Sequence, residues 1–207
     1  MTLGRVIRSF AAPANTGVNL AWDGRALWLT DIGTDRIYQI DPMTGRAIRS
    51  FAWAAGNGYG LTWDGRTLWI SDYTTDRIYQ VEPWGGQILR SFASPSGNGY
   101  SLASDGRYLW FTDNNTDLLS QIDPVTGRVV RSFATPAGFG AGLAWDGRTL
   151  WQSDIGSKLI YQVDPVTGRT LRSFAWATAG GYGLAWDGRT LWLNDLGAKR
   201  IYQIEVE

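Results

Sequence analysis

Hydrophobic and polar residues alternate along this chain in short runs that are separated by turn residues. In one stretch the runs are YGLTW (59–63), TLWIS (67–71), RIYQVE (77–82) and ILRSFA (88–93). Short alternating runs rich in aromatic and β-branched residues are typical of β-strands. Glycine and β-branched residues interrupt the windows in which a helix would have to lie. The pattern therefore predicts an all-β protein.

The residues between the runs are those that reverse the direction of a chain. Asp64-Gly65 separates the first two runs, and such a pair predicts a two-residue hairpin whose central residues have positive φ. The third and fourth runs are joined by DPMTGR (41–46) or DPVTGR (123–128 and 164–169) in three places. Proline presets φ in these turns and glycine supplies a left-handed residue. We therefore expect each group of four runs to form four antiparallel strands.

The group of four runs recurs five times with a period of 41 residues. The units begin at residues 4, 45, 86, 127 and 168, and each carries RSFA near its start and a Leu-Trp pair near its centre. Four strands at this period are typical of a β-propeller blade. A solenoid would usually end in atypical polar units, whereas the terminal units here resemble the inner ones. The sequence predicts one five-bladed β-propeller domain over residues 1–207.

The ends of the chain predict how the ring of blades closes. The chain begins with a fourth strand, GRVIRSFA (4–11), and ends with a third strand, KRIYQIEV (199–206). We expect the N-terminal strand to pair with the C-terminal blade, an arrangement of one strand plus three. Such pairing leaves no open sheet edge.

Composition narrows the chemistry that this chain can perform. Histidine and cysteine are both absent, which removes Ser-His and Cys-His nucleophiles and the commonest general base at neutral pH. Lys+Arg and Asp+Glu both number 19, so no basic surplus points to a nucleic-acid partner. No run of 18 apolar residues and no apolar N-terminal segment is present. We expect a soluble monomer without membrane segment or signal peptide, whose compartment the sequence does not indicate.

Two stretches resemble a known group of propellers. SDYTTDRIYQVEP (71–83) and GLAWDGRTLWLND (183–195) are similar to blades of the NHL, YWTD and SMP-30-like propellers, and more similar to the five-bladed glutamine cyclotransferase type. The resemblance covers the whole chain and implies the propeller fold, which carries lectins, hydrolases, cyclases and scaffolds. The near-identical units are typical of a recently amplified gene or an engineered, consensus-type protein.

The chain departs from the cyclotransferase pattern at the positions that this resemblance makes functional. That pattern has a Phe-Thr-Gln-Gly-Leu element entering the innermost strand, whose Gln helps to hold substrate. The corresponding stretches at 16–20, 57–61, 98–102, 139–143 and 180–184 carry no Gln. The glutamates, Glu82, Glu205 and Glu207, lie at or after third strands. The departure argues against cyclotransferase activity.

One aspartate per unit follows the second strand and forms the first candidate site: Asp31, Asp72, Asp113, Asp154 and Asp195. Clustered carboxylates are ligands for calcium or magnesium, so a metal in the channel is one interpretation. The other is that each Asp accepts backbone N–H groups within its own turn. We favour the second interpretation and expect no cofactor, because all five units share the residue.

The second candidate site is aromatic and lies where the loops lead into the channel. Its members are Trp53, Tyr59, Tyr100, Phe139, Trp176 and Tyr182, with Asn57 and Asn98 beside them. Aromatic faces next to amide side chains can stack on sugar rings and bond their hydroxyls. The alternative is that these rings fill the gaps between blades. In contrast, we expect Trp28, Trp69, Trp110, Trp151 and Trp192 to be core residues.

The third candidate is a break in the repeat. Gln152 stands where other units have Leu29, Ile70, Phe111 and Leu193, and a polar group in an apolar position needs a partner. Ser104 replaces a tryptophan that the other four units carry. An asymmetric ligand could be recognised at such places, although sequence drift explains them as well.

Two functions remain open. The first is a non-enzymatic binding module or scaffold whose partner is a glycan or another protein, with lectin-like binding at the channel mouth. The second is a cyclotransferase- or lactonase-like enzyme that uses aspartates and a channel-bound metal. An enzyme needs one locus where unlike polar groups converge, whereas this sequence offers five similar loci.

Overall fold

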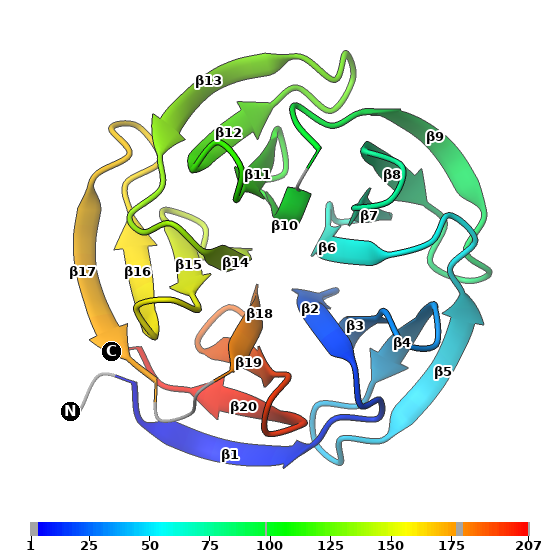
Figure 1. Ribbon diagram of the computed structural model, residues 1–207. Coiled ribbons are helices and arrows are strands. Elements are labelled where there is room, and N and C mark those ends of the chain that lie inside the picture. Colours follow the sequence, from blue (N-terminus) through cyan, green and yellow to red (C-terminus); the bar gives the residue numbers. More distant parts are fainter. Residues whose placement is uncertain (1–3, 98, 177–179, 207) are drawn as a thin grey trace.

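The computed structural model describes residues 4–97, 99–176 and 180–206. These residues form 20 β-strands in five four-stranded antiparallel sheets, which surround a central axis as blades (Figure 1). The predicted five-bladed all-β propeller is therefore confirmed. The described part of the chain holds no helix with the length and apolar character needed to cross a bilayer.

The blades have the same radial order of strands. The innermost strands are β2 (Gly17–Trp22), β6 (Gly58–Trp63), β10 (Gly99–Ser104), β14 (Gly140–Trp145) and β18 (Gly181–Trp186). The second strands are β3 (Leu27–Asp31), β7 (Leu68–Asp72), β11 (Leu109–Asp113), β15 (Leu150–Asp154) and β19 (Leu191–Asp195). The third strands are β4 (Arg36–Ile40), β8 (Arg77–Val81), β12 (Leu118–Ile122), β16 (Leu159–Val163) and β20 (Arg200–Ile204).

The outer strands are the perimeter of the ring in Figure 1. They are β5 (Ala47–Ala52), β9 (Ile88–Ala93), β13 (Val129–Ala134), β17 (Thr170–Ala175) and β1 (Val6–Ala11). We number the blades 1 to 5 from the inner strands β2, β6, β10, β14 and β18. In blade 5 the outer strand is β1, which pairs antiparallel with β20 from Ala11 opposite Arg200 to Val6 opposite Ile204.

An aspartate shapes the hairpin between the first two strands of each blade. In blade 2, Asp64 Oδ1 accepts the backbone N–H groups of Arg66 at 2.8 Å and Thr67 at 2.7 Å. The last backbone bond before the turn joins Asp64 N to Thr67 O, so Gly65 and Arg66 are the central residues. The prediction of Asp64-Gly65 at the centre, both with positive φ, is wrong by one residue. Of Asp64 and Gly65, only Gly65 has a positive φ. Asp64 stabilises the turn by accepting hydrogen bonds through its carboxylate.

The other oxygen of the same aspartate begins a hydrogen-bonded network that crosses the blade. Asp64 Oδ2 accepts the indole N–H of Trp69 and the hydroxyl of Thr67, both at 2.7 Å. Gln80 Nε2 donates to Thr67 Oγ1 at 2.8 Å, and Gln80 Oε1 accepts from Arg90 Nε at 2.8 Å. The Arg90 guanidinium lies 5.1 Å from the Trp69 ring centroid. Residues from the hairpin and three strands are thus tied together.

The indole-to-carboxylate bond occurs in all five blades. Its length is 2.7 to 2.9 Å in the pairs Trp28–Asp23, Trp69–Asp64, Trp110–Asp105, Trp151–Asp146 and Trp192–Asp187. Each of the five indoles is 1% exposed, which confirms that they are core residues. The core itself lies between neighbouring blades, since Trp28 and Phe51 of blade 1 pack with Leu61 and Ile70 of blade 2.

Deletion of residues 1–11 should abolish the cooperative melting of the monomer or shift it to oligomers. The deletion removes β1, the contact of Phe10 with Trp192 at 5.9 Å, and the bond from Arg8 to Gln203. It also leaves β20 as an unpaired edge. Calorimetry combined with size-exclusion chromatography measures both effects. A monomer that melts at the parental temperature would show that β1 does not close the ring.

The hairpin aspartates should make the protein sensitive to acid. Burial raises the pKa of Asp64, but the donors from Thr67, Trp69 and Arg66 outweigh it and hold the pKa below its usual range. Asp146 and Asp187 behave in the same way. A carboxyl whose pKa is lowered by folding stabilises the protein above its unfolded pKa, and that contribution is lost as the pH falls through the folded pKa.

We therefore expect a melting temperature that is nearly constant from neutral pH to about pH 5 and decreases progressively below about pH 4. The replacement Asp64→Asn should lower the melting temperature at pH 7 and reduce its dependence on acid. Differential scanning calorimetry at a series of pH values gives both quantities. Equal melting temperatures at pH 7 and pH 3 for the parent protein would contradict this role.

Candidate functional site

Four tyrosines lie at one end of the central channel, which we call the tyrosine mouth. Tyr59, Tyr100 and Tyr182 are the second residues of the inner strands β6, β10 and β18, and Tyr73 follows β7. This end of the channel is formed by the loops after the second and outer strands. At the equivalent inner-strand positions, blades 1 and 4 have the small buried residues Val18 and Ala141. The mouth is therefore aromatic on three blades and open on two.

The tyrosine rings of blades 2 and 3 contact one another. The ring centroids of Tyr59 and Tyr100 are 5.1 Å apart, and those of Tyr59 and Tyr73 are 5.5 Å apart. Tyr73 and Tyr100 are 6.4 Å apart in an edge-on arrangement, and Tyr73 is 41% exposed. The structure thus brings Tyr59 and Tyr100 together, as expected from the sequence, and adds Tyr73, which the repeat pattern did not indicate.

Burial and neighbouring phenols keep the phenols of Tyr59 and Tyr100 uncharged. Burial raises the pKa of Tyr59, and the phenols of Tyr100, Tyr182 and Tyr73 raise it further. Burial likewise raises the pKa of Tyr100, with additional contributions from Tyr73 and Tyr182. Each phenol can therefore donate and accept a hydrogen bond at every physiological pH.

Asn19 closes the channel beneath the tyrosines. Its Nδ2 donates to Ser101 Oγ at 2.9 Å and to the carbonyl oxygens of Tyr100 and Ala141, both at 3.2 Å. Because Asn19 belongs to blade 1, its amide spans the channel to blades 3 and 4. The side chain is fully buried, so the mouth has a floor and a ligand would rest on it instead of passing through.

The residue types at the repeat position of Asn19 indicate where the channel is closed. At the repeat position of Asn19 the other units have Gly60, Ser101, Gly142 and Gly183. A Cβ on Gly183 would lie 2.5 Å from Asn19 Cα, so the inner strands approach too closely there for side chains. The polar side chains of Asn19 and Ser101 among glycines therefore mark the level at which the channel is closed.

Two of the predicted aromatic residues are buried in the blades. Trp53 and Trp176 are 5% and 6% exposed. Trp53 Nε1 donates to Asp72 Oδ2 at 2.9 Å, and its ring meets Tyr79 edge-on at 5.2 Å. The prediction that these two rings offer faces to a ligand is wrong. Each folds over the first glycine of the next inner strand, where a Cβ would lie 3.2 Å from Trp53 and 2.7 Å from Trp176.

The remaining predicted residues are dispersed. Phe139 is 61% exposed on the loop before β14, and Asn57 donates to Thr74 Oγ1 at 3.1 Å within its own loop region. Asn98 lies outside the described residues. Gln152 is fully buried in β15, with its amide beside Gly140 at the start of β14, and neither amide atom has a hydrogen-bond partner. Gly140 provides its space, since a Cβ there would meet the Gln152 amide nitrogen.

The five repeated aspartates serve their own turns. In each of them, Oδ1 accepts the backbone N–H of a residue two or three positions further along the chain, at 2.6 to 2.9 Å. The second oxygen of Asp31 accepts from Thr16 N at 3.0 Å, and that of Asp154 accepts from Phe139 N at 2.7 Å. Across residues 4–97, 99–176 and 180–206, no three acidic side chains gather as a metal site would require.

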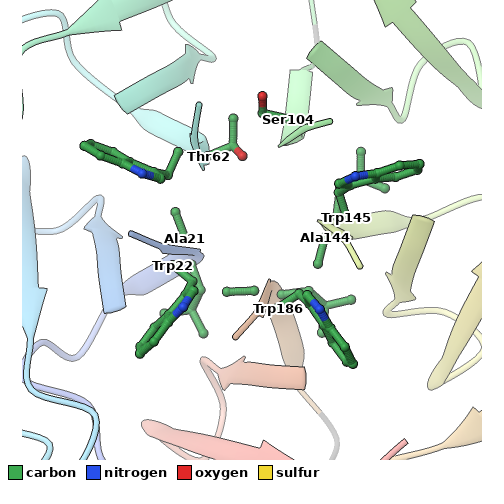
Figure 2. A pocket seen from close by; sticks show the side chains of 12 residues that line it. Ala21, Trp22, Thr62, Ser104, Ala144, Trp145 and Trp186 are labelled. Atoms are coloured by element: carbon green, nitrogen blue, oxygen red, sulfur yellow. The ribbon is translucent and has the colours of Figure 1, made fainter. Parts of the chain in front are cut away.

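A small cavity of about 70 Å³ lies at the opposite end of the channel (Figure 2). Trp22, Trp145 and Trp186 stand around it together with Trp63, and Ser104 occupies the place of the fifth indole. Ala21, Thr62 and Ala144 line its centre. The volume is enough for a few water molecules and too small for a sugar or a peptide side chain with its hydration.

No family model and no curated protein sequence matches this chain. Among solved structures, the chain is similar to glutaminyl cyclase from Myxococcus xanthus, with 15% identity, a TM-score of 0.82, and coverage of 98% of this chain and 96% of that one. It is similar to a streptogramin B lyase (17% identity, TM-score 0.59, 97% and 87% coverage) and to a chain of a nidogen/laminin complex (21%, 0.69, 94% and 77%). These likenesses show the propeller fold, which enzymes and binding proteins share.

Removal of divalent metals should leave the stability of the protein unchanged, because Oδ1 of each repeated aspartate is already bonded within its turn and no three acidic side chains of the described residues gather. Excess EDTA should shift the melting temperature by no more than its experimental error. A metal held by the native state at a hundredfold excess over its dissociation constant would add about 2.7 kcal/mol. A decrease of several degrees that added calcium reverses would contradict the turn assignment.

Proposed function

We propose that this propeller is a non-enzymatic binding module, and that a carbohydrate ring binds at the tyrosine mouth. The observation that carries the proposal is the convergence of Tyr59, Tyr73 and Tyr100 within 5.1 to 6.4 Å of one another, over a channel closed by Asn19. Aromatic side chains with a polar end are suited to ligands that are apolar on one face and rich in hydroxyls at the edge.

The charge of the mouth favours a neutral ligand. The raised pKa values of Tyr59 and Tyr100 keep both phenols protonated, so they offer hydroxyl groups and no ionic charge. Asp72, the residue before Tyr73, is 3% exposed, and its carboxylate accepts bonds from its own loop and from Trp53. A sugar hydroxyl would meet phenols, and an ion would meet no free countercharge at the tyrosines.

The asymmetry of the mouth favours a single ligand. Val18 and Ala141 are fully buried and leave blades 1 and 4 without a ring at this level. A pyranose lying over Asn19 would therefore have aromatic contacts on blades 2, 3 and 5 and open space on the other two. Burial of one such ring contributes roughly 1–3 kcal/mol, so several rings must act together to give useful affinity.

A cyclotransferase- or lactonase-like enzyme is the second candidate, favoured by the extensive overlap with the fold of glutaminyl cyclase. Its chemistry would require an acidic group that is free to act at the mouth. The repeated aspartates lie on this face, but Oδ1 of each accepts a backbone N–H of its own turn. The glutamates lie elsewhere: Glu82 accepts the N–H groups of Trp84 and Gly85 in a turn, and Glu205 pairs with Arg5 at 2.8 Å. Conversion of an N-terminal glutamine peptide to its cyclic product would support this candidate.

The binding proposal is tested on a glycan array, followed by calorimetric titration of the best ligand. Replacement of Tyr100 or Tyr182 by alanine should weaken binding about tenfold or more, because each change removes an aromatic contact worth over 1 kcal/mol. Tyr100→Phe should retain part of the affinity, since the ring remains and only the hydroxyl is lost. Tyr108→Ala is the matched control, because Tyr108 lies on the opposite face.

Binding that survives both alanine replacements would move the site away from the tyrosine mouth. Failure to bind any glycan would refute the carbohydrate proposal and leave a scaffold for another protein. The melting temperature of each variant must stay close to that of the parent, so that loss of binding is not loss of fold.

A further inference from the structure

A second hollow lies between blades 1 and 2, on the face opposite the tyrosine mouth. Its volume is about 710 Å³. Its walls are the hairpin of blade 1, the turn between β4 and β5, and the turn between β8 and β9, and they include Trp28, Trp63, Trp84 and Arg49. We call it the Trp84 groove. It shares no residue with the tyrosine mouth, so its assignment is independent of the carbohydrate proposal.

Arg49 lacks a hydrogen bond that the equivalent arginine makes in each of the other four blades. In those blades the equivalent arginine donates from Nε to the glutamine of the third strand at 2.7 to 2.9 Å, in the pairs Arg8–Gln203, Arg90–Gln80, Arg131–Gln121 and Arg172–Gln162. In blade 1, Nε and Nη2 of Arg49 are shielded from solvent and have no hydrogen-bond partner. Buried donors that lack an acceptor cost free energy, so a ligand that supplied an acceptor to Nε and Nη2 would gain from satisfying them.

Trp84 accounts for the difference. The Arg49 guanidinium lies 4.2 Å from the Trp84 ring centroid and 5.3 Å from that of Trp28, so it is held between two indoles. The corresponding turn residues of other blades are smaller: Met43, Val125 and Val166.

Blades 2, 4 and 5 have a threonine at the repeat position of Ala26, but the absence of that hydroxyl in blade 1 does not explain why Arg49 lacks a bond to Gln39. Blade 3 also lacks that threonine, because Tyr108 occupies the position, and yet Arg131 still bonds Gln121. We therefore attribute the missing bond between Arg49 and Gln39 to Trp84.

Within the part of the chain that the structure describes, no carboxylate forms an ion pair with Arg49, and the ion pair found there is Arg5–Glu205. Asp23, which lines the groove, already accepts from Trp28 and Gln39 through Oδ2 and from the hairpin through Oδ1. Asp41 likewise accepts bonds from its own turn. Nε and Nη2 of Arg49 therefore have no acceptor among the described residues, and a ligand would reach them when Trp84 moves aside.

We propose that the Trp84 groove binds a small carboxylate carried on a ring. Nε and Nη2 form the edge of the guanidinium that matches the two oxygens of a carboxylate in parallel hydrogen bonds. The ring of the ligand would pack on the indoles of Trp84 and Trp63. Trp84 is 71% exposed and precedes Gly85 and Gly86, so its ring can turn aside to admit the carboxylate to Arg49.

The test uses D-glucuronate as the probe and D-glucose as the matched ligand without a carboxylate. The Nε–H signals of the arginines are followed by NMR in a buffer free of carboxylates. Glucuronate should shift the Arg49 signal and leave those of Arg90, Arg131 and Arg172 in place, while glucose should shift none. Equal binding of glucose, equal shifts at all arginines, or no shift at Arg49 would overturn the proposal.

Trp84→Val places in blade 2 the residue that blades 3 and 4 already have, so the fold is expected to persist. Without ligand, the Arg49 Nε–H signal should move toward that of Arg90, because Gln39 becomes its acceptor. Glucuronate affinity should decrease about tenfold or more. Met43→Val, the same kind of change at the equivalent position of blade 1, should change neither, because Met43 contacts Arg8 and does not itself line the groove. Unaltered affinity in Trp84→Val would overturn the proposal.

Discussion

The hydrogen bond from an indole Nε1 to the hairpin carboxylate is the contact on which the construction of each blade depends. It satisfies a donor that is buried in the core and an acceptor that also shapes the tight turn. A hydrogen bond to a charged group contributes about 1.5–3 kcal/mol, and its loss leaves a buried polar group unpaired. The segment WDGRTLW (63–69) has near-identical copies at 22–28, 104–110, 145–151 and 186–192, and each copy supplies the turn, the core ring and the bond between them.

This regular framework makes the irregular positions informative. Asn19 is bonded across the channel to Tyr100 and Ala141, where three other units have glycine. Trp84 holds Arg49 away from the glutamine that its equivalents bond. In both places one substitution changes a repeated contact into a single asymmetric feature. The two proposed sites lie at such places, on opposite faces of the ring.

The sequence was sufficient for the architecture because strand alternation, turn residues and the period of 41 are local signals. The burial of the Trp69 indole follows from its place in the middle of an apolar strand. Prediction failed where the outcome depended on space left by a distant or neighbouring residue. Trp53 lies inside because Gly58 leaves room for its ring, and a loop tryptophan carries no local sign of that. The partners of Asn19 are 81 and 122 residues away, beyond any local pattern.

Native-state hydrogen exchange of the indole N–H groups tests most directly whether these bonds hold the blades together as one unit. The protons of Trp28, Trp69, Trp110, Trp151 and Trp192 should exchange only through global unfolding, with the same free energy and the same denaturant dependence. The exposed Trp84 should exchange rapidly and serves as the reference within the same spectrum. The blades would open separately if the five protons exchanged at unequal rates and denaturant did not change those rates. That result would contradict this account.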